Sequence, residues 1–256
     1  MHRCWVSPDA WDDRDLRLSP EETHHLLNVL RAAPGELVTV MDGRGREAEA
    51  RLTTVGAERG ASRRVVLEVV GKVRAVQPAV YLTLMQALPK GQRMDWIVEK
   101  ATELGVSEIL PVTTEHVVAR LREGQKDARR ERWQRIAQSA AKQCRTSWVP
   151  EVRPVCAFAD ALAVCAKADL FLVGALTPEA RLLRTVLEEA AKKSHPRSLA
   201  LLIGPEGDLS SAELAEAGRA GAVPVSFGPW VLRVDTAALF GLSVLVSEFP
   251  TRDSGA

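Results

Sequence analysis

Two short apolar runs near the end of the chain, residues 199–203 and 223–227, have the pattern of buried strands. The first run is almost purely apolar, which is typical of a strand that is covered on both faces. Between the two runs, Ser210 and Glu213 have the spacing of a capping box, which predicts a helix that begins at about Ser211.

The segment after these runs predicts a last helix with an unusual composition. Gly221 is expected to end the preceding helix in a left-handed conformation, and Asp235 or Thr236 is predicted to cap the last one. Ser243 and Ser247 are the only polar side chains in its next three turns. A sheet can cover only one side of such a helix, so a second surface must cover the rest. That surface is either another copy of the chain in a homodimer or another part of the same chain.

Glycine follows each of the two predicted strands, in the sequences Gly-Pro-Glu-Gly at residues 204–207 and Gly-Pro at residues 228–229. In open α/β sheets, ligands bind outside the carboxyl ends of the strands. Glycines at these ends let main-chain groups approach a ligand closely. The two neighbouring strands therefore predict a ligand site, although two ordinary strand-to-helix turns would show the same pattern.

The middle of the chain alternates between predicted strands and helices. Strands are predicted at residues 80–87, 106–112 and 170–176, and helices at residues 92–104, 162–168 and 177–193. This alternation is typical of a parallel α/β sheet.

Residues 1–76 have a different pattern, which predicts a separate small β-rich barrel domain. A short helix is predicted at residues 20–30, and a hairpin turn at residues 42–45 joins two predicted strands. Residues 64–73 predict a further strand. Residues 76–79, which include Pro78, predict the linker to the second domain.

Composition excludes several classes of protein. Of the 256 residues, 46% are apolar, so a sizeable core can form. The four cysteines form no CxxC pair and the five histidines have no ligand-like spacing, so we predict no metal site and reduced thiols in the cytoplasm. The first residues lack the apolar core of a signal peptide, and no stretch approaches the roughly 20 apolar residues of a membrane span.

Positive charge is concentrated in residues 117–153, although the net charge of the chain is only +1. This segment holds ten Lys and Arg residues against four Asp and Glu residues, an excess of six. The one-sided charge predicts a surface that faces phosphates, and a merely solvated helix face is the alternative.

Two stretches resemble the C-terminal signatures of the SPOUT methyltransferases, namely IGPEGDLS at residues 203–210 and FGPWVLRVDTAAL at residues 227–239. Within that superfamily they are similar to the 16S ribosomal RNA uracil-N3 methyltransferase family, whose signatures commonly read IGPEGGFS and LGPRILRTETAA. The chain departs from them at Asp208, Leu209, Phe227, Trp230, Val234 and Asp235. At Trp230 the departure removes a basic residue.

Three further segments match the same family: ALPKGQRMDWIVEKATELGVSEILPV, RWQRIAQSAAKQCRTSWVPEV and HHLLNVLRAAPGELVTVMDGRGREAEARL. The last resembles the PUA-like RNA-binding domain of the family. The resemblance implies a PUA-like domain at residues 1–76 and a SPOUT domain with a C-terminal trefoil knot at residues 77–256. It also implies S-adenosylmethionine as the methyl donor, 16S ribosomal RNA or the small ribosomal subunit as the partner, and a homodimer that pairs through the knot helix.

The resemblance and the two glycine loops together suggest which residues bind the ligands. The cofactor would be held by Leu172, Gly174, Ile203, Gly204, Gly207, Phe227, Gly228, Val231 and Leu232. RNA would be held by Arg31, Arg44, Lys90, Arg93, Arg132, Lys142 and Arg145.

Methylation of uracil N3 requires removal of its proton or stabilisation of the developing anion. Arg233 is the candidate for stabilising charge on O2 or O4, or for holding a phosphate. Glu206 and Asp235 are candidate bases, with loop hydrogen bonding and helix capping as their alternative roles. Because N3 lies on the paired edge of uracil, the target should be unpaired or flipped out.

Other functions remain as alternatives from the sequence alone. The chain has no GxGxxG after a strand, no GxxxxGK[ST] and no GxSxG, so other nucleotide-binding enzymes and α/β-hydrolases lack their motifs here. A SPOUT enzyme that acts on a ribose 2′-hydroxyl or on transfer RNA is one alternative. An RNA-binding module without chemistry is the other, and it would not need the two glycine loops.

Overall fold

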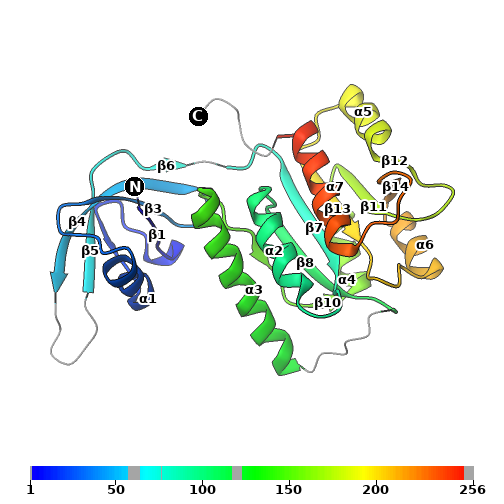
Figure 1. Cartoon of the computed structure of the whole chain (residues 1–256). Coiled ribbons are helices and arrows are strands. Elements are labelled where there is room, and N and C mark those ends of the chain that lie inside the picture. Colours follow the sequence, from blue (N-terminus) through cyan, green and yellow to red (C-terminus); the bar gives the residue numbers. More distant parts are fainter. Residues whose placement is uncertain (1, 57–63, 76, 117–122, 251–256) are drawn as a thin grey trace. The chain divides into compact units, whose positions relative to one another are not determined.

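A computed structural model of the chain (Figure 1) describes residues 2–56, 64–75, 77–116 and 123–250. The chain forms two compact units. Unit 1 consists of Met1–Gln77 and Ala141–Val149, and unit 2 consists of Pro78–Ala140 and Pro150–Ala256.

Unit 1 is built on a six-stranded sheet with the order β1-β3-β4-β5-β2, in which β6 also pairs with β4. The strands are β1 (His2–Trp5), β2 (Asp15–Arg17), β3 (Leu37–Met41), β4 (Arg46–Gly56), β5 (Arg64–Val69) and β6 (Arg74–Ala75). β1 runs parallel to β3, and the other pairs are antiparallel. The prediction of a β-rich domain is confirmed. Its closure into a barrel stays a prediction, because no pairing joins β1 to β2 among the described residues.

The hairpin predicted at residues 42–45 is confirmed between β3 and β4. Asp42 is buried at its start, and its Oδ1 accepts hydrogen bonds from the main-chain N–H groups of Arg44 (2.8 Å) and Arg46 (2.9 Å). Gly43 adopts a φ of 74°, and a side chain there would meet Val149 and Trp5 at 3.0–3.1 Å. This turn therefore requires glycine for both conformation and space.

The helix predicted at residues 20–30 is present but changes type along its length. α1 (Pro20–His24) is capped by Ser19, whose side chain accepts a hydrogen bond from the main-chain N–H of Glu22. It continues into η2 (His25–Val29), a turn of π-helix. A further short 3₁₀ turn, η1 (Pro8–Ala10), lies between β1 and β2.

The segment Ala141–Val149 belongs to unit 1, although more than sixty residues of the sequence separate it from the first segment of that unit, which ends at Gln77. Lys142 forms an ion pair with Glu22, and Ser147 donates a hydrogen bond to Glu47. The main-chain N–H of Val149 donates to the carbonyl of Gly43 at 2.8 Å. The sequence pattern, with its boundary at residues 76–77, did not predict this second segment, because its contacts with unit 1 are all long-range.

Unit 2 is built on an eight-stranded sheet whose strand pairs are all parallel, as predicted. Its order is β10-β8-β7-β13-β11-β14-β12, with β9 also paired to β8. The strands are β7 (Tyr81–Ala87), β8 (Glu108–Thr113), β9 (Glu151–Val152), β10 (Cys156–Ala157), β11 (Leu170–Gly174), β12 (Arg181–Leu182), β13 (Ser198–Ile203) and β14 (Val223–Ser226).

Helices cover both faces of this sheet (Figure 1). α2 (Arg93–Glu103) and α7 (Val234–Glu248) pack against each other on one face, with α5 (Leu183–Lys193) beside α7. α4 (Phe158–Cys165) and α6 (Ser211–Arg219) pack together on the other face.

β13 is buried on both faces, as its apolar run predicts. Ala200 and Leu202 belong to the core cluster beneath α4 and α6. Leu201 points the other way, toward Gly241 of α7, where a β-carbon would meet it at 2.7 Å. The small residue in the middle of α7 lets this helix pack closely on the strand.

The remaining helix, α3 (Glu123–Cys144), carries most of the basic run, and residues 117–122 of that run lie outside the described residues. None of the helices in the described ranges combines the length and apolar character that a membrane crossing requires.

Several predicted helix boundaries are confirmed and others are wrong. α6 begins at Ser211 with the full Ser210–Glu213 capping box, and Gly221 follows it with a φ of 92°. The helix predicted from residue 177 begins only at Leu183, because the exposed β12 comes first. The one predicted at residues 162–168 begins earlier, at Phe158.

The predicted cap of α7 is also wrong. The helix begins at Val234 after Arg233, whose extended backbone (φ −64°, ψ 153°) occupies the capping position without a side-chain hydrogen bond. Asp235 therefore lies inside the first turn, where its negative charge favours the helix N-terminus.

Candidate active site

Three loops of unit 2 meet at the carboxyl ends of β11, β13 and β14. The sequence pattern predicted that β13 and β14 are neighbours. That prediction is wrong, because β11 lies between them and pairs with both. β11 ends at Gly174, so three consecutive strands contribute loops to one place. Parallel strands bring their carboxyl ends to the same edge of the sheet, and this edge is where α/β proteins bind ligands.

A pocket of about 400 Å³ lies between these loops and the start of α7. It brings together seven of the nine residues predicted to bind a cofactor: Gly174, Ile203, Gly204, Phe227, Gly228, Val231 and Leu232. The other two do not line it. Leu172 is fully buried within β11, and Gly207 lies beside the ring of His116 instead.

Pattern reasoning did not single out several residues that also line the pocket: Ala175, Leu176, Pro205, Asp208, Val225, Ser226, Trp230, Val234 and Ala237. Most of them are neighbours in sequence of predicted residues, so the loop positions themselves could have identified them. Ala175 and Leu176 required knowledge that β11 lies between the other two strands.

The loop before α7 offers a run of unused main-chain donors. Among the described residues, no hydrogen bond is made by the main-chain N–H groups of Trp230, Val231, Leu232 and Arg233. Gly228 begins this loop with a φ of 124° and has open space around its α-carbon. Orphan N–H groups beside a helix N-terminus are well suited to ligand acceptor atoms.

Gly204 lines the pocket, and its lack of a side chain also matters within its own loop. A β-carbon there would meet the side chain of Leu209 at 3.2 Å and its main-chain nitrogen at 3.3 Å. The missing side chain therefore makes room for the folding of the loop itself. Asp208, in the same loop, adopts a left-handed φ of 60° and accepts a hydrogen bond from Leu209.

Glu206 is held firmly in its loop. Its carboxylate forms an ion pair with Arg93 and accepts hydrogen bonds of 3.0 and 3.2 Å from the main-chain N–H of Lys90. These contacts link the loop after β13 to the segment between β7 and α2. Both Glu206 and Arg93 line the pocket.

Arg233 and Asp235 occupy contrasting positions at the start of α7. Arg233 is exposed and lines the pocket, and its guanidinium has no partner among the described residues. Asp235 does not line the pocket, and its Oδ1 is buried without a hydrogen bond. Of the three predicted catalytic residues, Arg233 and Glu206 thus line the pocket and Asp235 does not.

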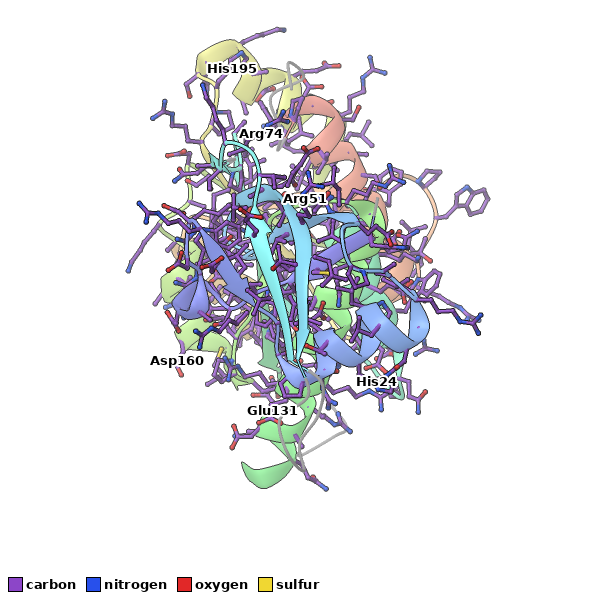
Figure 2. The ribbon with its side chains drawn as sticks, turned by 90° about the vertical axis from the view of Figure 1, so that its left-hand side faces the viewer. His24, Arg51, Arg74, Glu131, Asp160 and His195 are labelled. Atoms are coloured by element: carbon purple, nitrogen blue, oxygen red, sulfur yellow. The ribbon has the colours of Figure 1, made fainter. Side chains whose placement is uncertain are left out.

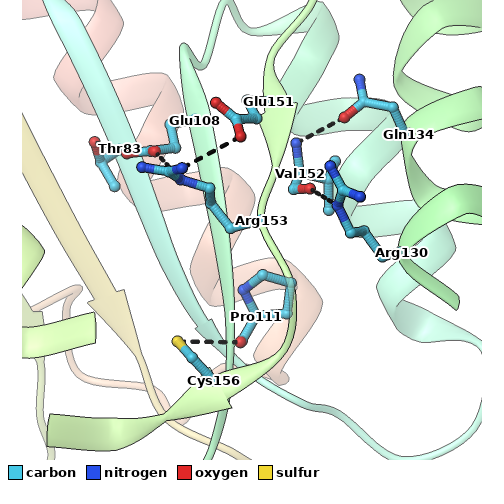
Figure 3. Close-up of polar contacts among 9 residues, drawn as sticks. All are labelled: Thr83, Glu108, Pro111, Arg130, Gln134, Glu151, Val152, Arg153 and Cys156. Carbon is cyan, nitrogen blue, oxygen red and sulfur yellow. Dashed lines mark hydrogen bonds and ion pairs between the residues drawn. The ribbon is translucent and has the colours of Figure 1, made fainter. Parts of the chain in front are cut away.

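Much of the described basic run is engaged in contacts within unit 2. Arg153 pairs with the buried Glu108 and with Glu151, and Arg130 donates to the carbonyl of Val152 (Figure 3). Arg132, a predicted RNA contact, pairs with Asp95 but keeps 57% of its side chain exposed. Lys90, also predicted to contact RNA, is exposed without a side-chain partner among the described residues.

In unit 1, the side chains of Arg31, Arg44 and Arg145 are exposed and have no partner among the described residues. The fourth predicted RNA contact, Lys142, is engaged by Glu22. His24 lies exposed at the end of α1 (Figure 2), with its Nδ1 2.8 Å from the side-chain nitrogen of Asn28.

Arg31 and Arg145 share an uncommon backbone. Their φ values are 57° and 63°, and Asp208 is the only other described non-glycine residue with a positive φ. Each arginine follows the end of a helical segment, a position where glycine is strongly preferred. An arginine at such a position costs conformational energy, and strained residues of this kind gather at functional sites.

Two buried thiols are the most perturbed titratable groups in the described chain. Burial raises the pKa of Cys4 to about 12, with the negative charge of Glu22 adding to the effect. Burial likewise raises the pKa of Cys165 to about 12. Neither thiol lines the pocket, and no group of three or more His, Cys, Asp or Glu side chains in the described residues is placed to hold a metal ion.

Comparisons with known proteins agree across the whole chain. A family model described as an RNA methyltransferase domain matches residues 76–246, and one described as an RNA methyltransferase PUA domain matches residues 18–59. The chain is 32% identical to ribosomal RNA small subunit methyltransferase E of Bacillus subtilis, over 89% of this chain and 88% of that protein. It is 35% identical to the protein of the same name from Mycobacterium tuberculosis, over 88% and 83%.

Solved structures give the same result. The methyltransferase E structure from Neisseria gonorrhoeae, bound to S-adenosylmethionine, matches with a TM-score of 0.79 and 29% identity over 96% of this chain and 97% of that one. A structure from Legionella pneumophila in complex with the same cofactor matches with a TM-score of 0.82 and 29% identity, over 96% of both chains.

Proposed function

Because the chain belongs to the ribosomal RNA small subunit methyltransferase E family, we propose that it transfers a methyl group from S-adenosylmethionine to N3 of a specific uridine in 16S ribosomal RNA. The observation that carries the proposal is the pocket at the carboxyl ends of β11, β13 and β14. It combines apolar walls, unused main-chain donors and an unpaired guanidinium, that of Arg233.

The residues of this pocket fit the methyl donor. Ile203, Val225 and Phe227 offer apolar surface for the adenine ring and the methylene groups. The N–H groups of residues 230–233 can donate to ring nitrogens or to a carboxylate. When bound, S-adenosylmethionine supplies a sulfonium methyl group that is already electrophilic. The protein need not build an electrophile, and its task is to align donor and acceptor, which can lower a barrier by roughly 7–11 kcal/mol.

Arg233 is the residue best placed to assist the acceptor. Uracil N3 carries a proton at neutral pH, and its loss places negative charge on O2 and O4. The guanidinium of Arg233 is exposed at the pocket and has no partner among the described residues, so it is available for this charge. Because N3 lies on the paired edge, the uridine must be unpaired or flipped out when it enters.

The two carboxylates differ in what they can do. Glu206 is occupied by Arg93 and the main chain of Lys90, so we propose that it mainly holds its loop in place. Asp235 has an unbonded Oδ1 in the first turn of α7, two residues after Arg233. We propose Asp235 rather than Glu206 as the group that accepts the proton, because its Oδ1 is not engaged by another described residue.

RNA would be held by phosphate contacts of both units. In unit 1, which carries the PUA domain match, the available cations are Arg31, Arg44 and Arg145. In unit 2, Lys90 and Arg132 are exposed beside the segment that follows β7. Each phosphate contact adds salt-dependent affinity.

We further propose that the chain acts in the cytoplasm as a homodimer and that residues 199–249 thread as a trefoil knot. The support for the homodimer comes from Phe240, an apolar side chain on the exposed stripe of α7 that it forms with Thr236, Ser243 and Ser247, at the spacing 4-3-4. Phe240 is 42% exposed. A two-fold pair would bury this stripe against its own copy.

Methyl transfer to a defined substrate tests the proposed function. Small ribosomal subunits from cells that lack this protein would be incubated with the purified protein and S-adenosylmethionine. Mass spectrometry of the nucleosides should then detect new 3-methyluridine in the 16S ribosomal RNA. Methylation of a ribose, methylation of transfer RNA alone, or RNA binding without any transfer would each contradict it.

A further inference from the structure

Trp230 combines two properties that rarely occur together in one side chain. It lines the pocket, yet 79% of its surface is exposed. A tryptophan that contributes to a core would be largely buried. The loop that carries it begins at Gly228 and Pro229 and presents no main-chain hydrogen bond at Trp230 among the described residues. The indole is therefore largely open to solvent beside the pocket, and the fold makes no ring contact with it among the described residues.

The other aromatic ring at the pocket, that of Phe227, packs against residues of the same chain. Phe227 packs against Phe240, with ring centres 5.7 Å apart. Its ring also lies against Gly174, where a β-carbon would meet it at 3.0 Å, and against Gly241. Among the described residues that line the pocket, Trp230 is the only aromatic residue whose ring makes no ring contact within the chain.

We propose that the indole of Trp230 stacks on the target uracil, or on the base next to it, and holds the RNA strand at the mouth of the pocket. This inference rests on the proposed function and names a substrate-positioning residue for it. A base that leaves its stack loses aromatic contacts, and enzymes commonly restore them with aromatic or apolar side chains. The family signature commonly has a basic residue at this position, which attracts phosphate. In this chain the contact is with a base, and it does not depend on charge.

The exposed apolar side chains of Leu176 (63%) and Val231 (76%) lie on the same rim. A partner subunit could also cover such a rim, since exposed apolar patches mark interfaces. The base is favoured because Trp230 lines the pocket into which the acceptor must reach. The partner is an outcome that the experiment can detect.

The test compares Trp230→Ala, Trp230→Phe and Trp230→Arg in the full-length protein, with small ribosomal subunits as substrate. Base stacking on an aromatic side chain is worth enough that kcat/KM for RNA should fall between about 5-fold and about 150-fold in Trp230→Ala. The loss should appear mainly in KM, and Trp230→Phe should recover most of it. The Kd for S-adenosylmethionine should stay unchanged, because most of the indole is outside the pocket.

Two controls separate stacking from other roles. The first control is Trp96→Ala. Trp96 is half exposed on α2 and does not line the pocket, so this variant removes an indole that makes no proposed RNA contact. The kinetic constants for RNA should not change. The slope of log affinity against log salt should be the same for Trp230→Ala and wild type, because no phosphate contact is lost. A reduced slope would mean that position 230 senses charge and would overturn the inference.

The remaining outcomes are equally decisive. If the wild type methylates 16S ribosomal RNA but Trp230→Ala leaves kcat/KM unchanged, the inference fails and the proposed function stands. A change in molecular mass by light scattering in Trp230→Ala or Trp230→Arg would assign the residue to a subunit interface. If the wild type transfers no methyl group to this RNA, it is the proposed function that fails.

Discussion

Arg93 and Glu206 form an ion pair although 113 residues separate them in the chain. Arg93 begins α2, and Glu206 lies in the loop after β13. Glu206 also accepts a hydrogen bond from the main chain of Lys90, so one carboxylate fixes two segments at the edge of the pocket. The sequence presented Glu206 as a candidate base, whereas its contacts are those of a structural residue.

Glu206→Gln distinguishes these roles. The amide keeps a hydrogen-bond acceptor for Lys90 but loses the ion pair, and a partly exposed pair is worth at most about 1 kcal/mol. We expect the Kd for S-adenosylmethionine to rise roughly two- to fivefold, with kcat at saturation nearly retained. Calorimetric titration and saturation kinetics measure both. A fall of kcat by two orders of magnitude with unchanged cofactor affinity would instead identify Glu206 as the base.

Arg233→Ala should affect the chemical step. Removing a donor that stabilises developing negative charge typically lowers kcat by roughly 10²–10³-fold. The Kd for S-adenosylmethionine should change little, since its proposed partners in this loop are main-chain groups. Single-turnover methylation with saturating RNA measures the step directly. If Arg233→Ala instead weakens RNA binding and leaves the single-turnover rate intact, the guanidinium holds a phosphate.

Arg31→Gly and Arg145→Gly should each stabilise the fold and weaken RNA binding. A left-handed conformation costs an L-residue about 1–2 kcal/mol, and the larger entropy of unfolded glycine offsets about 0.5–1 kcal/mol of that gain. The free energy of unfolding should therefore rise by up to about 1.5 kcal/mol per site. Chemical denaturation measures it, and RNA titration at several salt concentrations should show a slope reduced by about one per site.

Arg44→Ala is the matched control for these two variants. It removes an exposed unpaired cation in unit 1 from a position without a left-handed backbone. It should weaken RNA binding without any gain in stability. Glycine variants that bind RNA as tightly as the wild type would show that the strained arginines serve no RNA contact.

The buried thiols predict how stability depends on pH. In the unfolded chain Cys4 and Cys165 lose their protons near their ordinary pKa of 9.0, whereas the folded chain keeps them until about pH 12. The folded state binds more protons in this window, so the free energy of unfolding falls as the pH rises above about 9. Each thiol contributes at most about 1.4 kcal/mol per pH unit.

Urea denaturation between about pH 8 and about pH 9.5 can measure this slope, below the ordinary pKa of about 10 at which tyrosine ionises. Cys4→Ala should make the slope shallower. Cys144→Ala, at a half-buried position, controls for the loss of a thiol as such. Equal slopes for the wild type and Cys4→Ala would refute the assignment.

The exposed stripe of α7 predicts where a homodimer can be broken. Leu242 is fully buried within its own chain, so substitution there would disturb the fold. Ser243 is exposed, and Ser243→Arg should leave the fold intact while opposing a self-complementary interface by charge repulsion. Light scattering should show a shift from dimer to monomer at micromolar concentration. Ala215→Arg, on the exposed side of α6, is the control and should not change the molecular mass. A wild-type protein that is monomeric and fully active would contradict the proposed homodimer.

Local signals explain what could be predicted from the sequence. The apolar run of β13, the Ser210–Glu213 capping box and the 42–45 hairpin each depend on neighbouring residues, and each is confirmed. Strand order is not local. Nothing near β13 or β14 indicates that β11 separates them, because that order is fixed by packing across the sheet.

The same distinction applies to the site. The family resemblance and the glycines after strands together identified seven of the pocket residues, since such glycines mark turns that the chain must make. The engagement of Glu206 by Arg93, and of Lys142 by Glu22, depends on partners more than a hundred residues away. β12 escaped prediction because Arg181 and Leu182 are both exposed and show no apolar pattern.

The return of Ala141–Val149 to unit 1 limits how this protein can be dissected or recombined. A fragment that ends at residue 77 would lack the partner of Glu22 and the strand-like contact at Arg44. Exchanging the first unit between relatives would therefore require three crossovers, after residues 77, 140 and 149, so that the short second segment comes from the same parent as the first. Hybrids that take only residues 1–77 from one parent should express poorly, because their first unit would combine that piece with residues 141–149 of the other parent.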